Sequence, residues 1–184
     1  MDKNALYKKY KSIMEKITNE PPLADENGKI TRLGERLIAI SARYWPSAFL
    51  EVIKGIGPVA HTFLYNFGKV CGEAIASRYI EMGVPKEKVV EYVLAGGWYF
   101  GWCLGYVAKQ DFENKIIETV MLENFEADYG KGCHFMRGVH TGVWKRVVED
   151  EVYCEEVECK GRGGKVCRFV VKPSSKVILD GRVV

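Results

Sequence analysis

The sequence lacks any run that approaches the length of a membrane-spanning helix, and its most apolar part, residues 92–108, is interrupted by glycines and aromatic residues. Residues 1–12 are charged and contain no apolar core of a signal peptide. No block of Lys or Arg stands out, and the net charge over 184 residues is only +3. We therefore expect a soluble, cytoplasmic protein without a membrane span, whose main partner is not a nucleic acid.

Catalytic and cofactor motifs are also missing. We find no Ser/His/Asp or Cys/His set, no Cys-x-x-Cys pair and no nicotinamide or flavin fingerprint. The glycine-rich stretch at 161–165 does not lead into a helix, which argues against a phosphate cradle. The sequence therefore leans away from an enzyme.

Cysteines are well represented by comparison, and two of them bracket a glycine-rich turn near the end of the chain. Cys159 and Cys167 lie symmetrically about Gly163, with short apolar alternations on both sides. A β-hairpin with a loop at 162–164, in which Gly164 has a positive φ, would place the two thiols on one face, their Cβ atoms roughly 5 Å apart. Such a pair suits either half of a zinc site or a disulfide, and a reducing compartment favours the metal.

Periodicity and turn residues predict a single α+β domain, with a mostly antiparallel sheet and helices packed on one side. Residues 1–28 are expected to form an N-terminal helix and a linker, and residues 29–184 the domain. Residues 97–107 are expected to leave a helix, bend and enter a strand, and Tyr92 to point inward. The expected helices are 2–18, 48–54, 58–82, 85–96 and 133–148; the expected strands are 36–45, 114–125, 150–159 and 165–172, with a turn at 126–130.

The helix expected at about 58–82 carries an apolar stripe along one face (Val59, Phe63, Phe67, Val70, Ala74 and Tyr79). Gly68, Gly72 and Ala76 recur at every fourth residue, which gives a flat face that another backbone can approach closely. Two interpretations fit this helix. It packs against the sheet as a core helix, or it forms the interface of a homodimer.

A tetrahedral zinc site needs two further ligands besides Cys159 and Cys167. The candidates are Cys133, Cys154, His134, His140 and the acids at 155, 156 and 158. Cys133 opens the helix 133–148, where the helix N-terminus favours a thiolate. Strict strand alternation places Glu155, rather than Glu156, on the face of Cys159. Basic residues at 160, 162, 165 and 168 lie nearby and offset the negative charge of such a site.

The residues of the hairpin also resemble a known family. The run 156–159, the glycine-containing turn, Cys167-Arg168-Phe169 and the following Lys172-Pro173 are similar to the end of the 4-vinyl reductase domain. Cys133 followed by Phe135, Gly138 and Trp144 fits the same pattern, and the similarity covers about residues 33–173. The family includes the sensory domains of aromatic-responsive regulators, and its fold resembles a vesicle-tethering (TRAPP) subunit and the haem-NO-binding domains. Usage rich in Lys and Glu and almost without Gln suits an archaeal, stand-alone member.

The resemblance implies a closed, structural zinc site formed by Cys133, Glu156, Cys159 and Cys167, with a bulge or strand end between Glu156 and Cys159. It also implies a pocket for a small apolar molecule. The expected lining is Phe63, Phe67, Trp98, Tyr99, Trp102, Tyr106, Phe112 and Trp144. The His and Trp that hold phenol in the sensory members have no secure counterpart here. We therefore expect a sensor or carrier of a small hydrophobic molecule; the alternatives are an enzyme or accessory acting on a vinyl or tetrapyrrole substrate, and an interaction scaffold without a ligand.

Overall fold

The computed structural model describes residues 59–174 without a gap, together with residues 23–25, 27, 29–32, 35–41, 51, 55, 57, 178–179 and 182–183. The chain divides into two compact units, Met1–Ser41 and Ala42–Val184. The expected helix at 2–18 and nearly all of that at 48–54 lie outside the described residues. In the first unit, β1 (Ile30–Arg32) pairs antiparallel with β2 (Glu35–Leu37). The domain boundary after residue 28 stays a prediction.

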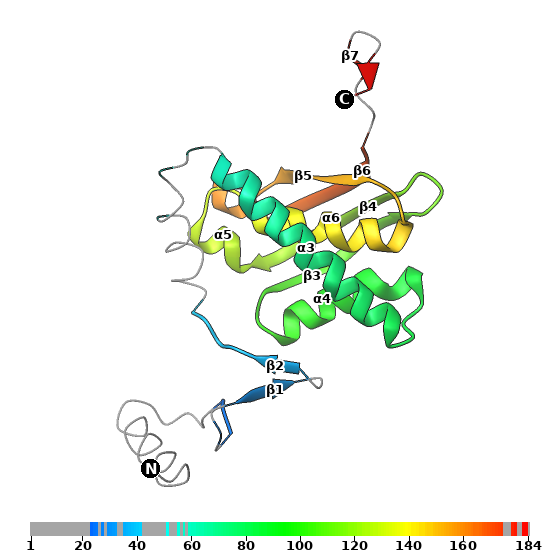
Figure 1. Cartoon of the computed structure of the whole chain (residues 1–184). Helices are drawn as coiled ribbons and strands as arrows, with labels where there is room; N and C mark the ends of the chain where they lie inside the picture. Colours follow the sequence, from blue (N-terminus) through cyan, green and yellow to red (C-terminus); the bar gives the residue numbers. More distant parts are fainter. Residues whose placement is uncertain are drawn as a thin grey trace. The chain divides into compact units, whose positions relative to one another are not determined.

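The second unit is built around a four-stranded antiparallel sheet (Figure 1). Its strands are β3 (Cys103–Asp111), β4 (Ile116–Asn124), β5 (Val152–Glu158) and β6 (Cys167–Pro173), in the order β3-β4-β6-β5. The final strand of the predicted hairpin thus lies in the middle of the sheet, because β6 pairs with both β4 and β5. Two short strands, β7 (Ile178–Leu179) and β8 (Arg182–Val183), pair only with each other among the described strands.

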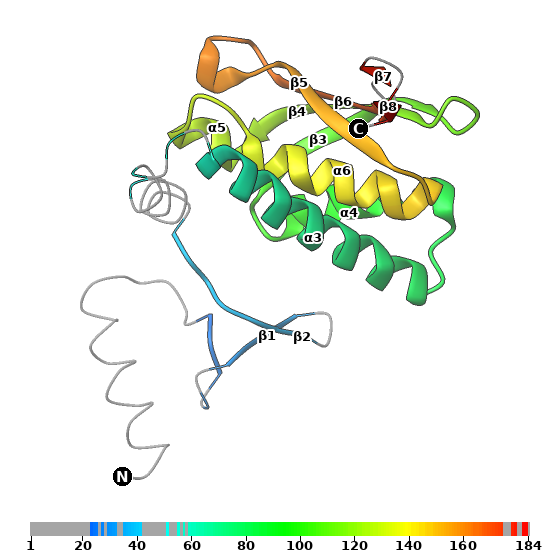
Figure 2. The same cartoon turned by 45° about the horizontal axis from the view of Figure 1, so that its top comes forward.

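The longer helices lie on one side of this sheet (Figure 2). They are α3 (Val59–Glu81), α4 (Val89–Tyr99) and α6 (His134–Val148). Helix α6 packs against β5 and β6, α4 packs against β3, and α3 packs on α6. Short helices complete the unit: η2 (Lys86–Lys88), α5 (Phe125–Tyr129) and η3 (Lys160–Arg162). The predicted α+β class, with an antiparallel sheet and helices on one side, is confirmed.

The flat face of α3 is used inside the chain. A Cβ atom added at Gly68 would lie 2.1 Å from the backbone oxygen of Phe135, and one at Gly138 would lie 2.0 Å from the backbone oxygen of Tyr65. Glycines on both helices therefore let the two backbones touch. The prediction that this face packs against the sheet or against a second copy was wrong, because α6 occupies it.

The apolar stripe of α3 is not the face that packs on α6. Val59, Phe63, Phe67 and Val70 are exposed, whereas the buried positions of the helix are Ala60, Leu64, Gly68, Gly72 and Ala76. Small side chains thus determine which face of α3 is buried, and bulky apolar residues lie outside it.

The core lies between α6 and the sheet. Trp144 is fully buried, and its Nε1 donates a hydrogen bond of 2.7 Å to the backbone oxygen of Lys115. The other predicted inward positions of α6 are also buried: Phe135, Met136, Val139, Val143 and Val147. Two details differ from expectation. Tyr92 of α4 is exposed, and the expected turn at 126–130 is the helix α5, whose N-cap is Asn124.

In the part of the chain that the structure describes, no helix is both long enough and apolar enough to cross a membrane.

Candidate metal centre and ligand site

The hairpin of β5 and β6 has the register that brings Cys159 opposite Cys167. Glu155 pairs with Val170 and Glu156 with Phe169, but Glu158 pairs with Arg168, so the ladder shifts between Glu156 and Glu158. This irregularity is the bulge that the family resemblance requires. The turn differs from the predicted 162–164 loop: η3 follows Cys159, and the positive φ of 91° belongs to Gly163 rather than Gly164.

Four predicted ligands converge at the end of this hairpin. The ligand atoms of Cys133, Glu156, Cys159 and Cys167 all lie within 4.8 Å of one another. Cys133 Sγ is 3.8 Å from Cys159 Sγ and 3.8 Å from Cys167 Sγ. Sulfurs bound to one tetrahedral zinc at about 2.3 Å would lie about 3.8 Å apart. The three cysteines are free and buried, so the spacing suits a shared metal and not a disulfide.

Glu156 presents one carboxylate oxygen that has no partner in the described part of the molecule. Its side chain is only 3% exposed. Oε2 accepts a hydrogen bond of 3.1 Å from the backbone N–H of Cys133 and lies 3.2 Å from Arg162 Nη1. Oε1 is buried without a hydrogen-bond partner. A buried, unpaired carboxylate oxygen is costly unless a cation binds it, so the donor set fits a metal ion.

The other candidate ligands point elsewhere. Glu155 forms an ion pair of 2.9 Å with Lys172, so strand alternation alone gave the wrong carboxylate. Cys154 Sγ makes its contact with the backbone oxygen of Glu155 at 3.7 Å. The ring of His134 stacks on His61 with 4.0 Å between centroids, and His140 packs against Phe169 at 4.7 Å.

Of the four basic residues expected to offset the charge, Arg162 pairs with a ligand carboxylate. Lys160 pairs with Glu123 instead, and Arg168 pairs with Glu118 and Glu158. Lys165 contributes its backbone N–H to Glu158 Oε1 at 2.8 Å.

The thiols of the metal-free cluster share protons. The hydrogen bond that Cys133 Sγ donates to Cys167 Sγ raises the pKa of Cys133 and lowers the pKa of Cys167 to about 7. Burial raises the pKa of Cys159 to about 11. A divalent ion that binds here therefore displaces protons from the other two thiols.

Sequence reasoning missed two buried polar residues that organise the start of α6. Glu126 Oε1 and Oε2 accept hydrogen bonds of 2.9 Å from the backbone N–H groups of Phe135 and Met136. Burial raises the pKa of Glu126 to about 7, although these N–H donors act in the opposite direction. Asn124 contacts Cys133 directly. A polar Asn-x-Glu signal at the end of a strand, typical of a helix cap, could have indicated both.

The predicted ligand-lining aromatics fall into two groups. The rings of Phe67 and Trp102 pack against Phe135, with 5.6 and 5.8 Å between centroids. Phe112 packs on the fully buried Trp144 at 5.2 Å, on another part of α6. The remaining predicted lining residues are exposed side chains: Phe63, Trp98, Tyr99 and Tyr106. Their role in binding stays a prediction.

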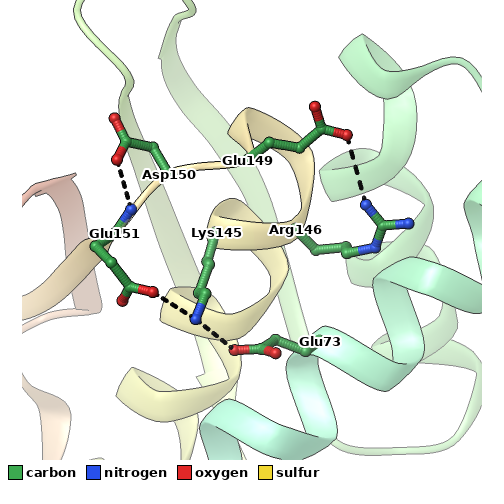
Figure 3. A pocket seen from close by; sticks show the side chains of 6 residues that line it. All are labelled: Glu73, Lys145, Arg146, Glu149, Asp150 and Glu151. Carbon is green, nitrogen blue, oxygen red and sulfur yellow. Dashed lines mark hydrogen bonds and ion pairs between the residues drawn. The ribbon is translucent and has the colours of Figure 1, made fainter.

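A charged pocket of about 340 Å³ lies where α6 meets β5 (Figure 3). Lys145 at its centre bridges Glu73 of α3, at 3.6 Å, and Glu151, at 2.6 Å. Arg146 and Asp150 complete the lining together with Glu149. Each acid of this pocket is paired with a base, since Glu149 contacts Lys86 and Asp150 contacts Lys115. The network links α3, α6 and β5, and it differs in character from the apolar pocket that the sequence predicts.

The comparisons with known proteins match this geometry. Residues 112–173 match the model of the 4-vinyl reductase domain, and this segment contains all four converging ligands. The uncharacterized protein MJ0150 of Methanocaldococcus jannaschii is 26% identical over 185 residues, which are 96% of each chain. This relative is archaeal, in agreement with the expectation for this chain.

Solved structures show the same fold. The phenol-responsive sensory domain of the transcription activator PoxR, crystallised with phenol, has a TM-score of 0.71 and 19% identity, over 82% of this chain and 83% of that one. Subunit 3 of the trafficking protein particle complex from Naegleria fowleri, covalently bound to palmitic acid, has a TM-score of 0.53 and 16% identity (73% and 95% covered). An H-NOX protein from S. oneidensis has a TM-score of 0.52 and 12% identity (90% and 88% covered). The chain therefore carries a 4-vinyl reductase domain on the fold shared with these three proteins, as its sequence resemblance predicts.

Proposed function

We propose that this chain is a small-molecule-binding domain, a sensor or carrier of a small apolar ligand, whose fold is held by a structural zinc ion at Cys133, Glu156, Cys159 and Cys167. The convergence of these four side chains carries the zinc part of the proposal. Three thiolates and a carboxylate satisfy a tetrahedral ion without an open position, so the zinc has a structural role.

The zinc would join two segments that are separate in the chain. Cys133 lies at the N-cap of α6, whereas Cys159 and Cys167 lie at the ends of the hairpin strands. Purified protein should contain about one zinc per chain by elemental analysis. Cys159→Ser should lose the metal and melt at a lower temperature than the wild type, whereas Cys71→Ser, on α3 away from the cluster, should retain it. Zinc-free wild-type protein with an unchanged melting curve would contradict this role.

The ligand part of the proposal is supported by similarity and by exposed aromatic side chains. The PoxR domain of the same fold was crystallised with phenol. In this chain, Phe67 and Trp102 flank Phe135, and Trp98, Tyr99 and Tyr106 lie exposed on α4 and β3. Aromatic surfaces of this kind suit a small, mostly apolar molecule. The proposed lining also includes Phe63, Phe112 and Trp144.

Native mass spectrometry of purified protein, followed by fluorescence titration with indole, phenol and a medium-chain fatty acid, tests the ligand part. Trp102→Ala should weaken binding of the ligand that the wild type takes, whereas Tyr153→Ala, on the opposite edge strand β5, should leave binding unchanged. Failure of all probes, or equal binding by both variants, would contradict the assigned lining.

A homodimer through α3 is part of the proposal, and it must use the outer face of the helix because α6 occupies the glycine face. Val59 and Val70 are 63% and 68% exposed, which is unusual for valine in a helix. Light scattering should give twice the chain mass for the wild type and a monomer for Val70→Glu. A monomeric wild type would refute the dimer.

A further inference from the structure

Asn124 lies at the end of β4 with both ends of its side-chain amide hydrogen-bonded. Its Nδ2 donates to Cys133 Sγ at 3.2 Å, and its Oδ1 accepts from the backbone N–H of Glu126 at 3.2 Å. The residue is 1% exposed, so water does not compete for either bond. Because Oδ1 must face an N–H donor, the orientation of the amide is fixed, and Nδ2 points at the sulfur.

Cys133 is the sulfur on which the cluster depends most. It is the sulfur that lies 3.8 Å from both of the others. An N–H donor stabilises a thiolate more than a thiol, because the hydrogen bond to the charged form is stronger. Cys167 receives a similar contact from the backbone N–H of Lys160 at 3.4 Å. Of these two N–H donors, the one on Cys133 comes from a side chain and can be removed by substitution.

The charge of the proposed site explains why such a donor matters. Three thiolates and one carboxylate leave two negative charges unbalanced around a divalent ion, in a buried setting where uncompensated charge is costly. Arg162 contacts the carboxylate, not a sulfur. The amide of Asn124 therefore supplies positive electrostatic potential directly at Cys133 and holds its Sγ in place.

We propose that Asn124 is a positioning residue of the metal centre, which raises metal affinity by donating a hydrogen bond to the Cys133 thiolate. This inference rests on the proposed zinc site. Partners that orient and polarise a metal ligand commonly change metal affinity by about 10- to 100-fold when they are removed.

Two substitutions separate this contact from the helix cap that the same side chain provides. Asn124→Ser keeps an oxygen that can accept from the N–H of Glu126 but is too short to reach Cys133, whereas Asn124→Ala loses both contacts. Both variants should bind zinc about 10- to 100-fold more weakly in competition with a chromophoric chelator. Asn66→Ser, at an exposed position of α3, is the matched control and should bind as the wild type does.

Cobalt substitution gives a readout that a purely structural role would not move. Loss of the N–H donor raises the energy of the sulfur lone pairs, so the sulfur-to-cobalt charge-transfer band should shift to lower energy in both variants and stay in place in Asn66→Ser. If the variants do not fold, a crystal structure of the zinc-loaded wild type decides the matter. Asn124 Nδ2 must then still contact Cys133 Sγ, and its displacement would overturn the inference.

The outcomes distinguish this inference from the zinc site itself. A wild type that takes up neither zinc nor cobalt overturns the proposed site and, with it, the role of Asn124. A wild type that binds zinc no more than twofold more tightly than Asn124→Ser, with an unshifted cobalt spectrum, overturns the role of Asn124 alone.

Discussion

Exchange of single carboxylates for amides on β5 tests the metal centre most directly. Glu155 and Glu156 are neighbours with different surroundings: Glu155 pairs with Lys172 at the surface, and Glu156 lies in the cysteine cluster. Glu156→Gln keeps the shape of the side chain but removes the charge from a proposed zinc ligand. Glu155→Gln is its matched control, because it makes the same chemical change one residue away.

The expected magnitude follows from the contacts. Loss of one of four ligands should weaken zinc binding by at least about 100-fold, which is about 2.7 kcal/mol of folding stability in excess zinc. For a chain of this length, that loss lowers the melting temperature by roughly 5–10 °C. Glu155→Gln removes one exposed ion pair, which contributes about 0–1 kcal/mol, and should leave zinc affinity unchanged.

The assay is thermal unfolding of both variants and the wild type, in excess zinc and in excess chelator. In chelator the deficit of Glu156→Gln should shrink, because in the metal-free protein Glu156 Oε1 is a buried oxygen without a partner among the described residues. Equal zinc affinity in Glu156→Gln and the wild type, or a larger loss in Glu155→Gln, would refute the assignment of the carboxylate.

Three further predictions test the core, the helix crossing and the charged pocket. Burial lowers the pKa of His140 to about 4, so folding requires the neutral ring; stability is fully present above pH 6.5 and falls by about 3 kcal/mol as the pH drops to 4. Urea unfolding across this range should show a loss that His140→Gln lacks, and parallel curves would contradict it. Gly138→Ala places a Cβ atom 2.0 Å from the backbone oxygen of Tyr65 and should cost about 1–3 kcal/mol, whereas Gly55→Ala, with no atom within 4 Å, should cost little. Lys145→Met removes the ion pairs to Glu73 and Glu151 and should cost at most about 1 kcal/mol at low salt; a loss that persists at 1 M salt would indicate packing instead.

Local sequence patterns identified the elements but not always their partners. The spacing of Cys133, Cys159 and Cys167 was sufficient to suggest ligands, because hairpin register and a helix start bring them together. The carboxylate was ambiguous because alternation breaks at the shift after Glu156, and no periodic pattern reveals a bulge.

The burial of α3 illustrates the same limit. Bulky residues form the stripe that hydrophobic periodicity detects, whereas backbone contact depends on small residues, which add little to that signal. Gly138 and Gly142 repeat on α6 the four-residue spacing of Gly68 and Gly72. The two matching glycine pairs, considered together, would have predicted the crossing that neither helix predicts alone.

The structure separates two ways of holding α6, and this separation makes a last prediction. Its N-terminus is held by polar contacts around the cluster, from Glu126 and Glu156, whereas its middle is held by backbone contact with α3. Removal of zinc should therefore increase amide exchange in α5, in η3 and at the start of α6, where contacts depend on charge neutralisation by the metal. The crossing of α3 and α6 should stay protected, because its contacts involve no charged group of the cluster. Hydrogen-exchange mass spectrometry with and without chelator measures both regions in one experiment. Equal deprotection of the crossing and the cluster would show that the metal stabilises the whole unit cooperatively, and not one end of α6.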